Sequence, residues 1–534
     1  MSAAEDPRVI KLRSARRGGE PPEDMILIKL VNGLLDKTAT QGELALIKSG
    51  MPIYQRGRSL VRPIKSEVAA SRGRTTIVAG LANFTATALT DKLCQCAHWQ
   101  KFDGRSKEWL RIDPPDKIAA TILSRVGEWR FPQVAGVVTT PTLRPDGSLL
   151  TAPGYDAATR LYHELDPTLD LSGHVPCRPK KADAERALAD LQYLLSNFPT
   201  VSEVDASVAL SALISPCVRG AVSVMPMHAF RASTAGTGKT YLVDVASAIA
   251  TGRPCPVATV AKSEEETEKR LGGLLLAAFP LICLDNVNGE LGGDLLCQAI
   301  ERPLVQIRPL GTSEIIEIES RATIFATGNA LRVRGDMTRR SLICNLDAGV
   351  ERPELRQFDF DPVEAVLSDR ARYVGACLTI VLAHISAGFP GAAAPLASFA
   401  DWSRYVRSAV LWLGCSDPCA SMEQAREDDP ELSELIDFIE AWDAEIGVSY
   451  APTTAEVIRM VGERWADEDD AVGEWKFPRM REVLTSIGSG RSGIDPVKVA
   501  GFCRSREGRI VRNRKLRRAG KGHAGAVRWQ LVKV

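Results

Sequence analysis

The spacing of apolar residues changes several times along the chain, and each change predicts a different kind of structure. Between residues 199 and 347, short apolar runs alternate with segments of helical period. The apolar runs cover residues 222–230, 279–284, 322–327 and 341–346. Such alternation is typical of a parallel β-sheet flanked by helices. Residues 182–197 precede this region and place Ala187, Leu188, Leu191 and Leu194 on one helical face. We therefore predict an α/β core preceded by a helix.

The segments that flank this core have other patterns. Residues 1–24 are polar and aperiodic, as in a disordered tail, whereas residues 25–181 combine short apolar runs with many turn signals. Residues 353–425 have an almost continuous helical period. An acidic linker at 423–434 is followed by three short helices and a β-hairpin that look like a winged helix. The predicted domains are a disordered tail (1–24), an N-terminal α+β domain (25–181), the α/β core (182–352), a helical lid (353–425) and a C-terminal winged-helix domain (426–534).

Composition narrows the class of protein. A chain of 534 residues, 45% of them hydrophobic, can form three or four domains with buried cores. Every stretch falls short of the roughly 18 uncharged apolar residues of a membrane helix, and the N-terminus lacks the apolar centre of a signal peptide. We therefore expect a cytoplasmic protein with reduced cysteines and without a membrane partner.

Charge is distributed unevenly, although the net charge is only +1. Residues 504–533 contain eleven Lys or Arg and one Glu, so this tip attracts polyanions such as DNA. The alternative is a solvated tail. The alternating strand at 527–532 needs a pairing partner and favours a folded, DNA-binding wing. Its predicted phosphate contacts are Arg512, Arg514, Lys515, Arg517, Arg518 and Lys521.

A phosphate-binding loop is predicted where an apolar run meets a helical pattern. Residues 233–240 match G-x-x-x-x-G-K-[ST], except that Ser233 occupies the first glycine position. Glycines let backbone N–H groups turn around the phosphates of ATP, Lys239 reaches the β- and γ-phosphates, and Thr240 is a ligand of Mg²⁺. The predicted nucleotide-binding residues are Ser233, Thr234, Ala235, Gly236, Thr237, Gly238, Lys239, Thr240 and Tyr241.

Two polar strand ends supply further candidate chemistry. Asp285 ends an apolar strand and suits the acidic partner of Mg²⁺, although a turn or helix cap is the structural alternative. Asn286 follows it, where ATPases of this kind place a glutamate that activates water. An amide cannot accept a proton, so three possibilities remain open: Asn286 only positions water, a carboxylate such as Glu290 replaces it, or hydrolysis is slow. Asn329, at the tip of the next strand, suits a sensor of the γ-phosphate.

Two arginines precede the last strand of the core. Arg339 and Arg340 suit an arginine finger that reaches the γ-phosphate of a neighbouring subunit, where a planar cation stabilises the transition state. A surface salt bridge is the alternative for either residue. The sequence does not indicate which of the two acts as the finger.

These motifs together resemble the AAA+ ATPases, and more narrowly the helicases of phages, prophages and satellite elements, often of primase/helicase type and related to superfamily-three and minichromosome maintenance helicases. The likeness is carried by residues 284–287, 326–329 and 334–340 and extends over about 190–425. It implies a hexameric ring with ATP sites between subunits and an N-terminal collar that contacts DNA. The Asp-Asn pair departs from the acidic pair of the broader class, which leaves hydrolysis less secure than nucleotide binding.

The resemblance also assigns roles to a hairpin and to the lid. Residues 305–318 read as a β-hairpin, and in related helicases a hairpin at this place grips DNA. We then expect Arg308 and the turn 311–313, with Thr312 and Ser313, to contact phosphates. A hairpin packed on the core is the alternative. In the predicted lid, Arg404 and Arg407 lie one turn apart where AAA+ proteins keep a sensor 2 arginine, and the sequence does not indicate which one it is. Solvated charges on a helix surface are the alternative for both.

The expected function is that of an ATP-dependent DNA helicase or translocase in the replication of a mobile element. Its expected partners are single-stranded or forked DNA, further copies in a ring, and a separate primase or initiator. Cys94, Cys96 and His98 are too crowded for a zinc site. A non-motor initiator or scaffold gated by ATP is the alternative that Asn286 favours. A remodeller of protein substrates fits the core but not the basic tip.

Overall fold

The computed structural model describes residues 25–70, 73, 75–259, 263–309, 314–465, 473–490, 493–522 and 525–534. The chain divides into two compact units. The first comprises Met1–Leu331 with Arg340–Met422, and the second comprises Arg332–Arg339 with Glu423–Val534.

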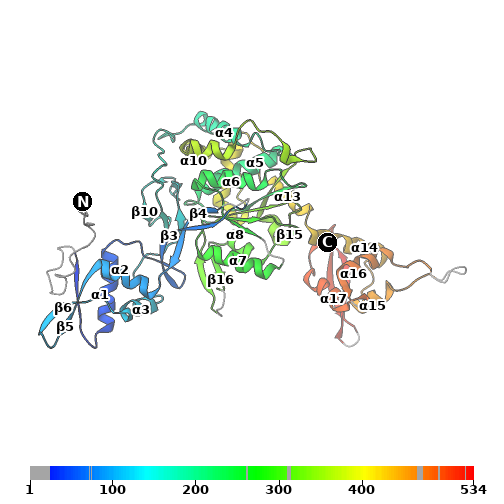
Figure 1. The fold of residues 1–534 in the computed structure, drawn as a ribbon. Helices are drawn as coiled ribbons and strands as arrows, with labels where there is room; N and C mark the ends of the chain where they lie inside the picture. The colour runs from blue at the N-terminus through cyan, green and yellow to red at the C-terminus, as the bar shows by residue number, and fades with distance from the viewer. Residues whose placement is uncertain are drawn as a thin grey trace. The chain divides into compact units, whose positions relative to one another are not determined.

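The first unit begins with an α/β lobe that has its own apolar core. Its sheet has the order β1-β5-β6, with β1 parallel and β6 antiparallel to the central strand β5. Three helices cover one face of this sheet, where Ile28, Leu93 and Trp99 are buried (Figure 1). The elements are β1 (Ile26–Leu30), α1 (Leu35–Lys48), α2 (Ala86–Cys96), β5 (Ala97–Asp103), β6 (Glu108–Arg111) and α3 (Asp116–Ser124).

Three further groups of strands belong to the first unit. An antiparallel meander comprises β2 (Tyr54–Arg56), β3 (Ser59–Ala69) and β4 (Thr75–Asn83). Two smaller groups follow, β10-β11-β7 and β8-β9. Their strands are β7 (Gly136–Val138), β8 (Thr142–Leu143), β9 (Leu149–Leu150), β10 (Gly154–Asp156) and β11 (Leu161–His163).

A five-stranded parallel sheet forms the centre of the first unit, in the order β13-β14-β18-β12-β20. The predicted α/β class with a parallel sheet is thereby confirmed. The first strand begins at Met227 and not at residue 222, because Pro226 has no N–H to donate to a neighbouring strand. The strands are β12 (Met227–Ala232), β13 (Val257–Thr259), β14 (Leu281–Asp285), β18 (Thr323–Gly328) and β20 (Ser341–Leu346).

Helices cover both faces of the central sheet, which explains why its strands are apolar on both sides. Figure 1 shows α4, α5, α6 and α10 on one side of the sheet and α7 and α8 on the other. The helices are α4 (Lys181–Leu195), α5 (Glu203–Ile214), α6 (Lys239–Thr251), α7 (Glu264–Leu276) and α8 (Asp294–Glu301), with a 3₁₀ turn at Ser215–Val218. After α8, a hairpin comprises β16 (Leu304–Ile307) and β17 (Ile316–Glu319).

The segment after β20 is largely helical. It contains a 3₁₀ turn at Pro353–Leu355, α9 (Pro362–Ser368), the long α10 (Arg370–Ser386), a 3₁₀ turn at Ala397–Phe399, α11 (Ala400–Trp402), a π-helical turn at Ser403–Arg407, α12 (Ser408–Trp412) and α13 (Ala420–Glu427). The remaining short elements are β15 (Glu290–Leu291), β19 (Arg332–Val333) and a 3₁₀ turn at Gly335–Arg339.

The second unit packs helices against a three-stranded antiparallel sheet, β23-β24-β25. Its core includes Phe438, Trp442, Leu484 and Trp529. The elements are α14 (Pro430–Glu445), α15 (Thr454–Met460), α16 (Pro478–Gly488), β21 (Ser489–Gly490), β22 (Gly493–Ile494), α17 (Pro496–Ser505), β23 (Ile510–Val511), β24 (Arg514–Lys521) and β25 (Val527–Lys533).

The prediction of an acidic linker at 423–434 is wrong, because α13 and α14 occupy most of it. Asp429 caps α14 by accepting a hydrogen bond from Glu431 N, and Pro430 occupies the first helical position. Downstream, Leu435, Phe438, Ile439 and Trp442 repeat at helical spacing and enter the core. The helix signal therefore begins inside the acidic stretch.

In the part of the chain that the structure describes, every helix is too short or too polar to cross a membrane.

Candidate functional site

The predicted phosphate-binding loop lies at the carboxyl edge of the parallel sheet. It occupies residues 233–238, between the end of β12 and the first residue of α6. Strand β18 pairs with β12 on one side and with β14 on the other. All three strands are parallel, so the ends of β14 and β18 lie at the same edge as the loop, the usual ligand site of such sheets.

The loop needs its glycines for two separate reasons. Gly236 and Gly238 have φ angles of 76° and 101°, which L side chains rarely adopt. A Cβ atom on Gly238 would also lie 3.3 Å from the Phe198 ring, and one on Gly236 would lie 3.1 Å from Glu354 N. The loop is thus compact, and its backbone N–H groups precede the N-terminus of α6.

Side chains inside the loop hold its shape. Thr237 Oγ1 donates to Thr234 O at 2.8 Å, and Lys239 Nζ donates to the same carbonyl at 2.9 Å. Ser233 and Ala235 are exposed. Tyr241, in the first turn of α6, hydrogen-bonds the carboxylate of Asp361.

Lys239 is the cation of this loop, and its side chain is largely buried. Burial lowers the pKa of Lys239, while the nearby carboxylate of Asp285 opposes this shift. The Lys239 ammonium is desolvated and donates to a carbonyl group, so an anion that binds beside it would stabilise its charge.

Asp285 accepts hydrogen bonds from two hydroxyl groups on different elements. Thr240 Oγ1, on α6, lies 3.0 Å from Asp285 Oδ1, and Thr327 Oγ1, on β18, donates to the same oxygen. Thr327 was not predicted as a site residue. Its only sequence signal is a hydroxyl at the end of an apolar strand, and its contact with Asp285 depends on the strand order. The structure thus brings Lys239, Thr240, Asp285 and Thr327 together.

The chain after Asp285 turns tightly against the end of β18. Asn286 is exposed and has a φ of 57°, a left-handed conformation that Asn tolerates better than Glu. Val287 N donates to Thr327 O at 2.7 Å, and a Cβ on Gly328 would lie 2.1 Å from Val287 O. Asn286 therefore suits the backbone of this turn, which is a structural reason for an amide at this position. Asn329 follows Gly328 and is half-buried, whereas Glu290 is exposed in β15.

The two candidate finger arginines differ in exposure. The side chain of Arg340 is 6% exposed, and its Nε donates to Glu301 Oε2 at 2.8 Å. The side chain of Arg339 is 56% exposed and forms an ion pair with Asp336 at 3.3 Å. Only Arg339 of this pair presents its guanidinium to solvent.

The candidate sensor arginines of the lid have local partners. Arg407 forms an ion pair with Asp417 at 2.6 Å and donates to Ala394 O at 3.1 Å. The exposed Arg404 stacks over the Phe389 ring, with Cζ 4.1 Å from the ring centroid. These contacts give both residues a structural role within the helical segment 353–425.

The predicted DNA-gripping hairpin is packed at its base. β16 and β17 pair in antiparallel orientation, as a hairpin requires, and Arg308 is exposed just beyond β16. Gly57 and Arg58, in the turn between β2 and β3, lie against β17: Arg58 forms an ion pair with Glu314 at 3.7 Å, and a Cβ on Gly57 would meet Ile316 and Ile318. Thr312 and Ser313 lie outside the described residues.

The positive charge on and beside β24, in the second unit, is partly neutralised by acidic side chains. Three of its predicted phosphate contacts form ion pairs with acidic side chains of their own unit: Arg512 with Glu440, Arg514 with Asp443, and Arg518 with Glu507. Leu516 faces the core, so Lys515 and Arg517 point to the opposite side of β24. With Lys521, which is exposed, these two cations form the outward surface of the strand.

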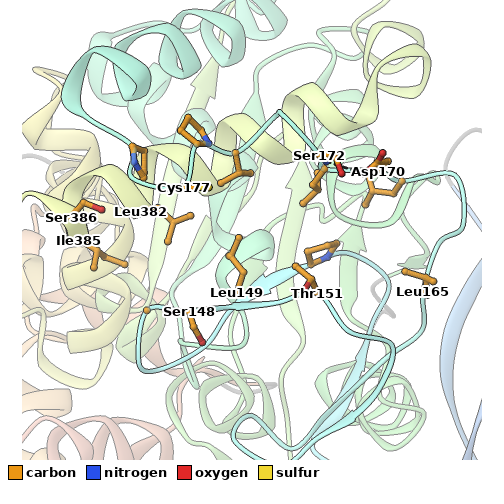
Figure 2. A pocket seen from close by; sticks show the side chains of 17 residues that line it. Ser148, Leu149, Thr151, Leu165, Asp170, Ser172, Cys177, Leu382, Ile385 and Ser386 are labelled. Carbon is orange, nitrogen blue, oxygen red and sulfur yellow. Dashed lines mark hydrogen bonds between the residues drawn. The ribbon is translucent and has the colours of Figure 1, made fainter.

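Two of the cavities in the first unit are large enough to hold a ligand. One of about 490 Å³ is lined by α4, α5 and residues 413–416 and includes Phe198, the residue that touches the phosphate loop. Another of about 700 Å³ lies between residues 141–179 and the end of α10, where Leu149, Leu382 and Ile385 line it (Figure 2). Its lining is mainly apolar and shares no residue with the phosphate loop.

Cys94, Cys96 and His98 lie around the start of β5. Within the described ranges, no group of three or more His, Cys, Asp or Glu side chains is arranged to hold a metal ion by itself.

Comparisons with known proteins give only distant likenesses. No family model matches the chain, and no curated protein matches it. Among solved structures, the C-terminal region of NrS-1 in an apo form is 11% identical, with a TM-score of 0.37 over 92% of this chain and 98% of that one. A structure described as the active helicase Cch of SCCmec type IV is 12% identical, with a TM-score of 0.35 over 90% and 97%. Likenesses at these values assign neither a family nor a function.

Proposed function

We propose that this chain is an ATP-dependent DNA helicase or translocase that acts in the replication of a phage or another mobile element. The observation that carries the proposal is the convergence of Lys239, Thr240, Asp285 and Thr327 at the carboxyl edge of a parallel sheet. A cation, two hydroxyls and one carboxylate beside a glycine loop are the groups that MgATP requires.

The donor set fits ATP and Mg²⁺. Backbone N–H groups of the loop and Lys239 would bind the phosphates, and Thr240 and Asp285 would hold the metal ion. Bound Mg²⁺ would neutralise charge on the β- and γ-phosphates. The cavity that includes Phe198 lies near the loop and has a lining of mixed polarity. Thr327 fixes the orientation of the Asp285 carboxylate, and Asn329 would lie near the γ-phosphate.

The arginine finger is assigned to Arg339. A finger must leave its own subunit and enter a neighbour's site, so it needs an exposed guanidinium. Arg339 meets this condition, whereas Arg340 is buried against Glu301. This assignment implies a ring in which each ATP site is completed by the adjacent copy, as in a hexamer.

DNA contacts are assigned to the second unit and to the hairpin after α8. Lys515, Arg517 and Lys521 face outward from β24, and we infer that the second unit is a winged helix that uses them on phosphates. Arg308 is exposed at the hairpin, and residues 353–425 would act as the lid. A separate primase or initiator would complete the replication complex.

The decisive experiment is the ATPase rate with and without single-stranded and forked DNA. We expect DNA to stimulate the wild type and Lys239→Ala to abolish turnover. Lys269→Ala is a matched control, because Lys269 is an exposed lysine on α7. Equal rates for wild type and Lys239→Ala would show that the activity does not arise at this loop.

A second function is favoured by one observation. Asn286 stands where a water-activating carboxylate is expected, and its left-handed backbone suits Asn. A protein that binds ATP without hydrolysing it would be an ATP-gated initiator or scaffold on DNA. ATP-dependent DNA binding without strand displacement or turnover would support that function and refute the motor.

A further inference from the structure

The sheet of the N-terminal lobe has one face covered by helices and one face without them. Ile28 and Trp99 point to the covered face, so their neighbours in sequence point the other way. We call this second surface the open face. Register and alternation assign to it Leu27, Lys29, His98, Gln100, Phe102, Trp109 and Arg111. His98 and Gln100, in the middle of this face, are buried, whereas Lys29, Phe102 and Arg111 are exposed.

Aromatic rings lie at one end of the open face. Phe102 is 47% exposed, and its ring centroid lies 5.6 Å from that of Trp109, which is directly opposite it on β6. The two rings meet edge to face, at 63°. Trp109 is half-buried, so Phe102 is the ring that presents more of its surface to solvent.

Cations surround these rings. Lys29 reaches across the central strand, with Nζ 4.8 Å from the Trp109 centroid, and Arg111 lies beside Gln100. The turn between β5 and β6 adds Arg105 and Lys107. The carboxylate of Asp103 accepts hydrogen bonds from the backbone N–H groups of Arg105 and Ser106, which keep its pKa low and fix the turn.

An exposed ring beside a half-buried one, with cations around them, matches the chemistry of an unpaired nucleic-acid strand. Its bases present apolar, stackable faces, and its phosphates seek Lys and Arg. An acidic protein partner would use the cations but not the flat rings. Duplex DNA would also leave the rings unused, because its bases are already stacked.

We propose that the open face binds single-stranded nucleic acid, with bases stacked on Phe102 and Trp109 and phosphates held by Lys29 and Arg111. A base on Trp109 displaces Lys29 from the ring, and the released ammonium then meets a phosphate. This site is separate from the ATP loop and from β24, so its binding requires no nucleotide.

The test is binding of a fluorescent dT15 oligonucleotide to the full chain, without nucleotide, followed by anisotropy. Phe102→Ala should weaken the affinity roughly tenfold, because stacking of one base on one ring is lost. Phe102→Tyr keeps the ring and should bind as the wild type does. Leu44→Ala is the matched control: Leu44 is an equally exposed apolar residue on α1, in the helical layer.

Salt dependence tests the phosphate contacts. The Lys29→Ala, Arg111→Ala double variant should reduce the slope of log affinity against log salt by about 1.4, at about 0.7 for each single-strand contact. U15 in place of dT15 distinguishes RNA from DNA, and binding of either supports the proposal.

Two outcomes would overturn the proposal. In the first, Phe102→Ala melts at the same temperature as the wild type and binds dT15 and U15 with unchanged affinity. The rings would then be a binding site for a protein partner instead of a nucleic acid. An equal loss of duplex binding in Phe102→Ala would show that stacking is not the mechanism. Neither result depends on ATP hydrolysis, so failure here and failure of the helicase proposal remain distinguishable.

Discussion

Substitution of Thr327 tests the candidate metal site, because the role of this residue follows from the structure and was not predicted from sequence motifs. Its hydroxyl and that of Thr240 both donate to Asp285 Oδ1. Thr327→Val removes the hydroxyl and nearly preserves the volume of the side chain. If Asp285 is the metal-binding carboxylate, Thr327 orients it without touching the metal or the nucleotide.

The magnitude follows from the kind of bond that is lost. A hydrogen bond to a charged group stabilises by about 1.5–3 kcal/mol. Because 1.4 kcal/mol is about a factor of ten, the affinity for Mg²⁺ should fall by roughly 10- to 100-fold. The same range is typical when a group that supports a metal ligand is removed.

The assay is the ATPase rate at saturating ATP as a function of free Mg²⁺. In Thr327→Val we expect the half-maximal Mg²⁺ concentration to rise at least tenfold, while binding of a fluorescent ATP analogue in EDTA stays unchanged. Thr323→Val is the matched control. Thr323 lies at the opposite end of β18, is fully buried, and contacts Met225 Sδ at 3.6 Å instead of a carboxylate.

Two results would refute this reasoning. If both valine variants have the same Mg²⁺ dependence as the wild type, Asp285 does not depend on Thr327 for metal binding. If Thr327→Val lowers the melting temperature but leaves the Mg²⁺ midpoint unchanged, the hydroxyl serves only the fold.

Three further predictions concern stability. Burial lowers the pKa of His228 from 6.5 to about 3, so between these pH values only the unfolded chain binds the proton. The free energy of unfolding should therefore be highest above pH 6.5 and lower by about 2 kcal/mol at pH 5. His228→Gln should reduce this difference, as measured by urea titrations at the two pH values. Gly328→Ala should cost about 1–3 kcal/mol because its Cβ would clash with Val287 O, whereas Gly273→Ala, whose Cβ meets nothing within 4 Å, should not destabilise; calorimetry compares them. Arg340→Met should cost about 3–5 kcal/mol because it removes a largely buried ion pair with Glu301. Arg339→Met should change stability by less than about 0.5 kcal/mol and still lose ATPase activity. A large loss of stability in both variants would contradict the assignment of the finger.

The phosphate loop was predictable from sequence because its chemistry is local. Glycines at fixed spacing, a lysine and a threonine must be contiguous to enclose phosphates, and the preceding apolar run identifies the strand. Asp285 was predictable for a similar reason, since a carboxylate ends an otherwise apolar strand. Both are patterns within a few consecutive residues.

Contacts between distant residues were not predictable in this way. Arg340 and Glu301 are 39 positions apart, and nothing in either local pattern indicates that they pair. The Thr327 contact with Asp285 requires β18 to lie beside β14. The open face was missed because its rings and cations come from three strands whose order is set by tertiary packing.

The hairpin after α8 is connected to the candidate ATP site through one buried guanidinium. Arg56 donates from Nη1 to Glu319 O, at the end of β17, and from Nη2 to Leu275 O, near the end of α7, at 2.7 and 2.8 Å. Burial lowers its pKa to about 10, so it remains charged near neutral pH and suits the negative end of a helix. After α7, the chain continues into β14, which ends at Asp285. The base of the hairpin is therefore joined by Arg56 of β2 to the helix that precedes the strand of the candidate metal-binding carboxylate.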